Sequence, residues 1–191
     1  MLLAGGRGSR LKARRLKALV ELGGETLLVR AHRTLSEVCD EVVVCAPVSV
    51  AISLGLEGVV SDAEGGAGPL AGIVAGLAAR PHDRAVVLGV DFPLMRSATL
   101  AALLDRLGDH DAAIAEPGGS PQPLAAAYGG KVAGKLATEW ERGERSILAA
   151  ARRMDTEWVD DTELDAIDGG REAFFNVNTP DDLEKATRSM A

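Results

Sequence analysis

Apolar runs and amphipathic stretches alternate along the chain. Residues 84–90 form an almost continuous apolar run of strand length, which is typical of a strand buried on both faces of a sheet. Residues 26–38 place their apolar side chains at helical spacing instead. Strands that alternate with helices indicate a largely parallel sheet covered by helices. We therefore expect a Rossmann-like three-layer α/β/α sandwich with a mostly parallel central sheet.

The same patterns assign the other elements. We expect further strands at residues 1–3, 41–46, 59–60, 112–115, 124–128 and near 158, and further helices at residues 69–79, 98–107, 132–140, 146–154 and 180–189. Thr179 is a suitable N-cap for the last helix, and Pro180 suits its first position. No internal repeat or low-complexity tract interrupts the 191 residues, so we expect one domain over residues 1–191.

Positive charge is concentrated near the start of the chain. Residues 1–33 hold eight Lys/Arg and two Asp/Glu, whereas the remainder holds 13 and 26, and the formal net charge is −7. An acidic body argues against a nucleic-acid partner, while a local basic segment suits a compact polyphosphate. A solvated basic surface is the alternative. With no signal peptide and no apolar run of membrane-spanning length, we expect a cytoplasmic protein without a membrane partner.

Glycines in the basic segment could cradle phosphates. Gly5, Gly6 and Gly8 follow the first apolar residues, and small residues there let backbone N–H groups approach a phosphate closely. Arg10 and Lys17 come next and could neutralise charge on a leaving pyrophosphate, so both are candidate catalytic residues. The segment fits neither the Walker pattern nor the dinucleotide fingerprint. A tight turn alone would explain the glycines equally well.

A single carboxylate follows the apolar run of the expected central strand. Asp91 comes directly after residues 86–90 and therefore at the carboxyl edge of a parallel sheet, where ligands bind. One carboxylate with triphosphate oxygens and waters suits Mg²⁺, so Asp91 is the expected metal ligand and a candidate catalytic residue. A turn or capping role before Pro93 is the alternative. Asp62, which follows residues 59–60, is a weaker candidate. The histidine and cysteine spacings suit no zinc site.

Six short segments, spread over nearly the whole chain, form a recognisable pattern. They are Leu3-Ala4-Gly5-Gly6, Lys17-Ala18-Leu19, Gly68-Pro69-Leu70-Ala71-Gly72, Asp91-Phe92-Pro93-Leu94, Gly143-Glu144-Arg145 and Asn176-Val177-Asn178-Thr179-Pro180-Asp181-Asp182-Leu183. The pattern resembles the molybdenum cofactor guanylyltransferases (the MobA family), which belong to a wider nucleotidyltransferase superfamily. The first and fourth segments are shared across that superfamily, whereas the last, after an aromatic pair, is typical of the family.

The resemblance implies a reaction and its site. It implies Mg²⁺-dependent transfer of GMP from GTP to molybdopterin, which releases pyrophosphate and forms molybdopterin guanine dinucleotide. Transient contact with molybdenum cofactor enzymes or carriers would follow. The residues it assigns are Leu3, Ala4, Gly5, Gly6 and Lys17 to the GTP phosphates, Asp62 to the nucleoside, Asp91 to Mg²⁺ and GTP, and Asn176 and Asn178 to the pterin. Without the resemblance, both asparagines would be interpreted as turn or capping residues.

Three departures from the family pattern keep alternatives open. The stretch between Arg10 and Lys17 is longer and more basic than the family's and lacks its aspartate, so it looks more like a sugar-phosphate nucleotidyltransferase. Cys45 stands where some members have an asparagine near guanine. Few residues precede Leu3 in the expected first strand. The alternatives are a transferase that uses CTP or a sugar phosphate, and a nucleotide-binding protein without turnover.

Overall fold

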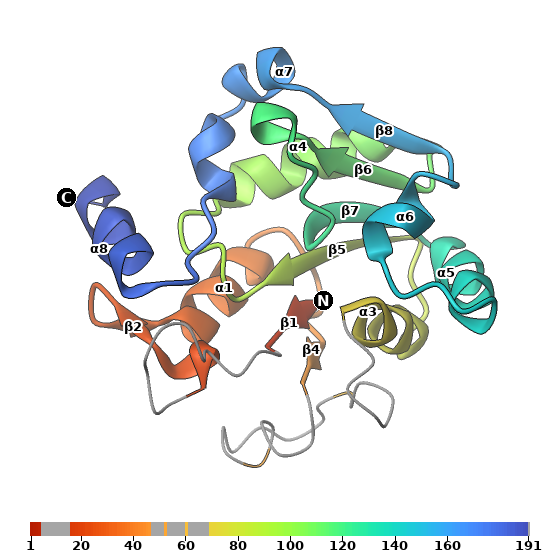
Figure 1. The fold of residues 1–191 in the computed structure, drawn as a ribbon, viewed down its shortest axis with the longest axis horizontal. Coiled ribbons are helices and arrows are strands. Elements are labelled where there is room, and N and C mark those ends of the chain that lie inside the picture. The colour runs from red at the N-terminus through yellow and green to blue at the C-terminus, as the bar shows by residue number, and fades with distance from the viewer. Residues whose placement is uncertain (5–15, 47–51, 53–59, 61–68, 191) are drawn as a thin grey trace.

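The computed structural model describes residues 1–4, 16–46, 52, 60 and 69–190. Within these ranges, a six-stranded sheet crosses the molecule (Figure 1). In spatial order its strands are β4 (Val44–Cys45), β1 (Leu2–Leu3), β5 (Arg84–Gly89), β7 (Ala125–Gly129), β6 (Ala112–Ala115) and β8 (Thr156–Val159). β1 lies parallel to β4 and β5, and β8 lies parallel to β6. The expected mostly parallel sheet is confirmed.

β7 is the exception, because it runs antiparallel to both of its neighbours. Residues 116–124 connect it to β6 and contain only the short 3₁₀ turn η3 (Pro117–Gly119). A parallel return needs a crossover of about a dozen residues or more, usually with a helix. The short connection therefore allows only a hairpin-like return.

Helices cover both faces of the sheet (Figure 1). The helices and 3₁₀ turns are η2 (Lys17–Leu19), α1 (Leu27–Ser36), α3 (Pro69–Ala78), α4 (Ser97–Leu107), α5 (Val132–Glu141), α6 (Ile147–Ala151), α7 (Asp161–Asp165), η4 (Gly170–Phe174) and α8 (Pro180–Ser189). One buried cluster joins α1, α4 and η4 to the sheet, and another joins α3, α5 and α6 to it. The predicted three layers are therefore confirmed. None of the helices in the described ranges has the length and apolar character needed to cross a bilayer.

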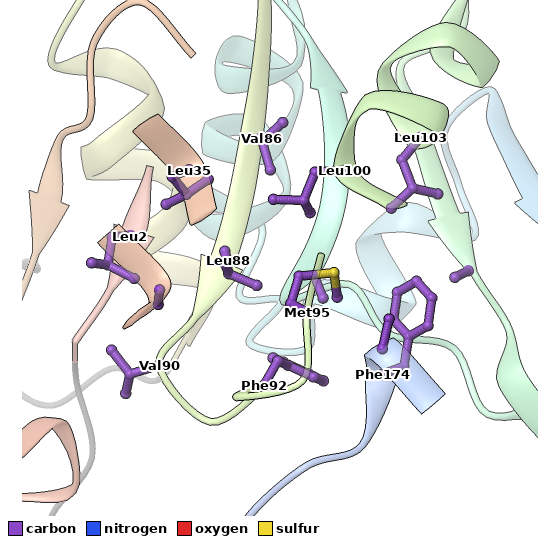
Figure 2. Close-up of a cluster of buried hydrophobic side chains, with 14 of the residues drawn as sticks. Leu2, Leu35, Val86, Leu88, Val90, Phe92, Met95, Leu100, Leu103 and Phe174 are labelled. Atoms are coloured by element: carbon purple, nitrogen blue, oxygen red, sulfur yellow. The ribbon is translucent and has the colours of Figure 1, made fainter. Parts of the chain in front are cut away.

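The side chains of the central strands alternate between the two buried clusters. Val86 and Leu88 of β5 point into the cluster drawn in Figure 2, whereas Val87 belongs to the opposite cluster. All three side chains are at most 1% exposed. Since side chains of a strand alternate between its faces, this apolar run lines two cores at once and fixes the strand's register.

Several predicted elements differ from the observed ones. The strand expected at 41–46 contains only β4, and Val60 joins it through one bridge to Cys45; residue 59 lies outside the described residues. The hairpin of β2 (Glu21–Leu22) and β3 (Glu25–Thr26) was not predicted. Its turn uses Gly23 and Gly24 at φ 62° and 81°, a conformation that glycine adopts without strain.

Candidate functional site

The site lies where β1 and β5 end side by side. Leu3 pairs with Gly89 across the two parallel strands, and the Val90 N–H donates to the Leu3 carbonyl at 3.1 Å. Asp91 follows directly, and Ala4 leaves the neighbouring strand at the same edge. The edge is therefore the carboxyl edge of parallel strands, as expected for the ligand side of such a sheet.

Lys17 reaches Asp91 from the short turn η2. The side chain of this lysine is only 10% exposed, and its Nζ donates to Asp91 Oδ2 at 3.1 Å. The same Nζ donates to Asn178 Oδ1 at 2.9 Å. A lysine with so little exposure needs acceptors to replace the water it has lost, and these two oxygens supply them.

The segment before α8 brings two asparagines to the same carboxylate. Val177 is fully buried and its N–H donates to the Asp91 carbonyl at 2.9 Å. Asn176 and Asn178 flank it, and alternate residues of an extended segment share one side. Asn176 Nδ2 donates to Asp91 Oδ2 at 3.0 Å, and Asn178 Nδ2 donates to Asn176 Oδ1 at 2.5 Å. Together with Lys17, these side chains close a ring of hydrogen bonds, hereafter the four-residue ring.

The start of α8 anchors this segment. Thr179 Oγ1 accepts from the Asp182 N–H at 3.2 Å, and Asp182 Oδ2 accepts from the N–H groups of Thr179 and Asn178 at 2.8 and 3.0 Å. The predicted N-cap is confirmed, and it is part of a capping box. The Thr179 side chain first, and then the N–H groups of Asn178 and Thr179, hold the pKa of Asp182 below its ordinary value.

The carboxylate of Asp91 suits a cation that takes one protein ligand. No donor to its Oδ1 is found among the described residues, whereas Oδ2 is occupied by Lys17 and Asn176. A Cβ built on Gly89 would clash with Oδ1, so the missing side chain makes room for that oxygen. The described ranges hold no cluster of three His, Cys, Asp or Glu side chains suited to a metal. This donor set fits Mg²⁺ completed by phosphate oxygens and waters.

A cavity of about 550 Å³ borders the four-residue ring. Its lining combines apolar, amide and charged residues, including Leu94, Pro117, Phe175, Gln122, Asn176, Arg171 and Glu172. The Gln122 Nε2 donates to the Ser120 carbonyl at 3.1 Å, which fixes the orientation of its amide. Apolar walls with a few placed polar groups are typical of a ligand pocket.

The structure brings together four of the predicted site residues and places two more beside them. Lys17, Asp91, Asn176 and Asn178 form the ring, and Leu3 and Ala4 end the adjacent strand. Gly5, Gly6, Arg10 and Asp62 lie outside the described residues. Sequence reasoning missed Gly89 and Gln122. Gly89 leaves room for the Asp91 carboxylate. In the sequence, the signal for this was its position two residues before an aspartate that follows a strand.

The Gly143-Glu144-Arg145 segment serves the start of α6. Glu144 Oε1 accepts from the N–H groups of Arg145 and Ser146 at 2.8 Å each, and its Oε2 accepts from Arg153 at 2.7 Å. The Arg153 contact and then the two N–H groups lower the pKa of Glu144 to about 2. The Arg145 guanidinium stacks on Trp140, 3.7 Å from the ring centroid. These contacts are local and include no member of the four-residue ring.

Comparison with known proteins gives consistent matches. Residues 1–156 match the family described as the MobA-like NTP transferase domain. A molybdenum cofactor guanylyltransferase of Desulfosudis oleivorans is 30% identical, with 100% of this chain and 94% of the relative covered. One of the same name from Pseudomonas putida is 35% identical, with 96% and 94% covered. The crystal structure of molybdopterin-guanine dinucleotide biosynthesis protein A from Archaeoglobus fulgidus matches with a TM-score of 0.82 at 28% identity, covering 99% of this chain and 96% of that chain.

Proposed function

The chain belongs to the MobA-like NTP transferase domain family and is a nucleotidyltransferase, and from this premise we propose that it transfers GMP from GTP to molybdopterin. Pyrophosphate is the second product, and molybdopterin guanine dinucleotide is the cofactor formed. The names of relatives that match over nearly the full length of the chain support the choice of nucleotide and acceptor. The observation that carries the proposal is the Lys17–Asp91 pair at the carboxyl edge of β1 and β5.

Four site residues that the structure describes have a part in this proposal. Asp91 would hold Mg²⁺, and the ion would supply Lewis-acid polarisation of the triphosphate. Lys17 neutralises charge that develops on the phosphates as the leaving group departs. The end of β1, Leu3 and Ala4, brings backbone close to the phosphates. From the sequence we add Gly5, Gly6 and Arg10 on the phosphates, and from the family resemblance Asp62 on the nucleoside.

The chemistry needs little from the protein beyond positioning. A phosphate oxygen of the acceptor attacks the α-phosphate in line, and the bond to the β-phosphate oxygen breaks as pyrophosphate leaves. A phosphate nucleophile is already ionised near neutral pH, so no general base is required. Catalysis then rests on alignment and charge neutralisation, which matches the Lys17–Asp91 ion pair among the described residues of the site.

The cavity beside Asn176 is the place we assign to the acceptor. Its volume of about 550 Å³ suits a small heterocyclic ligand. Phe175 offers a surface for a flat ring, and Gln122 offers an amide that can pair with a heterocycle edge. The cavity shares Asn176 with the four-residue ring, so a bound acceptor lies next to Asp91.

Family membership also bears on where the enzyme acts and which proteins it contacts. We propose that residues 1–191 act as one domain in the cytoplasm. Contacts with molybdenum cofactor enzymes or carriers would be transient, because the product must be handed on.

A transferase that uses CTP is the second candidate. Cys45, at the end of β4, carries a thiol where some relatives carry an amide near guanine, so a strong hydrogen-bonding group is absent there. Pyrophosphate release with Mg²⁺, molybdopterin and each of the four NTPs separates the candidates. We expect release with GTP alone. Release with CTP alone would replace the proposal by the second candidate, and release only with a sugar phosphate as acceptor would replace molybdopterin.

A further inference from the structure

We propose that Asn176 and Asn178 are positioning residues, which hold the Asp91 carboxylate and the Lys17 ammonium in the orientations that nucleotidyl transfer requires. The inference deepens the proposed function and rests on it. It gives the two asparagines a task different from pterin recognition, the role that the family resemblance implies. Its basis is the closed set of four hydrogen bonds among these side chains.

On both sides of the ring, the hydrogen bonds are donated from Lys17 towards Asp91. A lysine ammonium only donates and a carboxylate only accepts, whereas an amide does both. Asn178 therefore turns its oxygen to Lys17, and Asn176 turns its nitrogen to Asp91. The remaining nitrogen and oxygen of the two amides then face each other and form the fourth hydrogen bond. Each asparagine thus uses both ends of its amide within the ring.

The charges explain why amides occupy these positions. The side chains of Lys17 and Asp91 are 10% and 20% exposed, so their ionic forms need partners in place of water. Amides provide hydrogen bonds without adding charge, and the ring stays neutral. A carboxylate in place of Asn176 would stand against Asp91 and repel it, whereas one in place of Asn178 would face the Lys17 ammonium.

The ring also selects which oxygen of Asp91 has no donor among the described residues. Lys17 and Asn176 both donate to Oδ2. Oδ1 lies over Gly89, where a side chain would clash with it. Asn176 therefore fixes the rotation of the carboxylate so that Oδ1 stays available for a cation.

The backbone makes this arrangement rigid. Val177 is fully buried between the two asparagines and donates to the Asp91 carbonyl. The Asn178 N–H is held by the capping carboxylate of Asp182 at the start of α8. Groups that orient reacting residues work best when their own positions are locked by packing and hydrogen bonds.

Steady-state kinetics distinguish positioning from pterin recognition. We expect Asn176→Ala and Asn178→Ala each to lower kcat by about 10- to 100-fold, the effect of losing one hydrogen bond to a charged group. The KM for Mg²⁺ should rise in Asn176→Ala, and the KM for the acceptor should stay unchanged in Asn178→Ala, because Asn178 does not line the acceptor cavity. Gln122→Ala is the control, since it removes an amide of the acceptor cavity outside the ring; it should raise the KM for the acceptor only. A rise confined to the acceptor KM in the asparagine variants would overturn the inference.

Charged replacements give a second, directional test. Asn176→Asp should lose more activity than Asn178→Asp, because only the former places like charges together. Pterin recognition sets no such order, so equal losses or the reverse order would contradict positioning.

A readout without turnover separates this inference from the proposed function. In ¹H–¹⁵N spectra of the lysine ammonium groups, wild-type protein should show a signal protected from exchange that Lys17→Arg removes and Asn178→Ala weakens. Absence of that signal in the wild-type protein would show that the four-residue ring does not form, and would overturn the inference. If the wild-type protein releases no pyrophosphate but shows the signal, the proposed function fails while the ring stands.

Discussion

At the scale of single residues, the site depends on contacts between distant positions. Lys17 and Asp91 are 74 positions apart, and Asn178 lies 161 positions from Lys17. Sequence patterns predicted each of these residues as a candidate, because Asp91 ends an apolar strand and the others belong to recognisable segments. They did not predict that both asparagines bond to the ionic pair. Side-chain pairing over such separations follows from the packing of η2 and the segment before α8, which no local pattern encodes.

Gly89 gives a prediction at this scale. Gly89→Ala should displace the Asp91 carboxylate, because the added Cβ clashes with Oδ1. A misplacement of about 1 Å at a reacting group costs on the order of 100-fold in rate. We therefore expect a loss of this size in pyrophosphate release, measured at saturating GTP and acceptor, together with a raised KM for Mg²⁺.

Gly134→Ala is the matched control for Gly89→Ala. A Cβ at Gly134, inside α5, meets nothing within 4 Å, and alanine is favoured over glycine in a helix by about 1 kcal/mol. This variant should keep wild-type activity and unfold at a slightly higher urea concentration. Wild-type turnover in Gly89→Ala would show that the room beside Oδ1 is not needed.

At the scale of elements, periodicity located most helices and the long strands. The helices expected at 69–79 and 98–107 correspond to α3 and α4, and that at 180–189 corresponds to α8. The direction of β7 was harder to predict, because β7 carries the same apolar pattern as the parallel strands of the sheet. Its direction follows from the short connection after β6, so the length of that connection was the signal to use.

The capping box of α8 leads to a stability prediction. Thr179→Ala removes the hydroxyl that accepts from the Asp182 N–H, and loss of such a cap costs about 1 kcal/mol. Urea unfolding should show this decrease in the free energy of unfolding. Thr187→Ala, which removes a hydroxyl from within α8, should cost less, because alanine is a better helix former. Equal losses in the two variants would rule out a special role of the cap.

The start of α6 should make stability depend on pH. Glu144 has an ordinary pKa of 4.5 and a folded-state pKa lowered to about 2, first by Arg153 and then by the Ser146 and Arg145 N–H groups. A lowered folded-state pKa contributes stability above the ordinary value, and this contribution is lost as the pH falls from 4.5 towards 2. Glu144→Gln should therefore unfold at a lower Tm than wild type at neutral pH. The difference should shrink in acid; a difference in Tm that is independent of pH would contradict this role.

At the scale of the whole molecule, the sheet explains why the site stands where it does. Two buried clusters fix β5 from both faces, so the strand delivers Asp91 to a defined point at its carboxyl edge. Composition and charge predicted the class of ligand but not the nucleotide. The basic segment between Leu3 and Lys17, where the sequence departs from the family pattern, lies mostly outside the described residues. Its roles, including that of Arg10, stay predictions.

The most direct measurement is pyrophosphate release with Mg²⁺, GTP and molybdopterin, in wild-type protein and in Asp91→Ala. Asp83→Ala serves as the control, because this exposed carboxylate comes just before the opposite end of β5. We predict release by the wild type and by Asp83→Ala, and none above background by Asp91→Ala, with both variants folded by circular dichroism. Wild-type turnover in Asp91→Ala would contradict a nucleotidyl-transfer site built on this carboxylate.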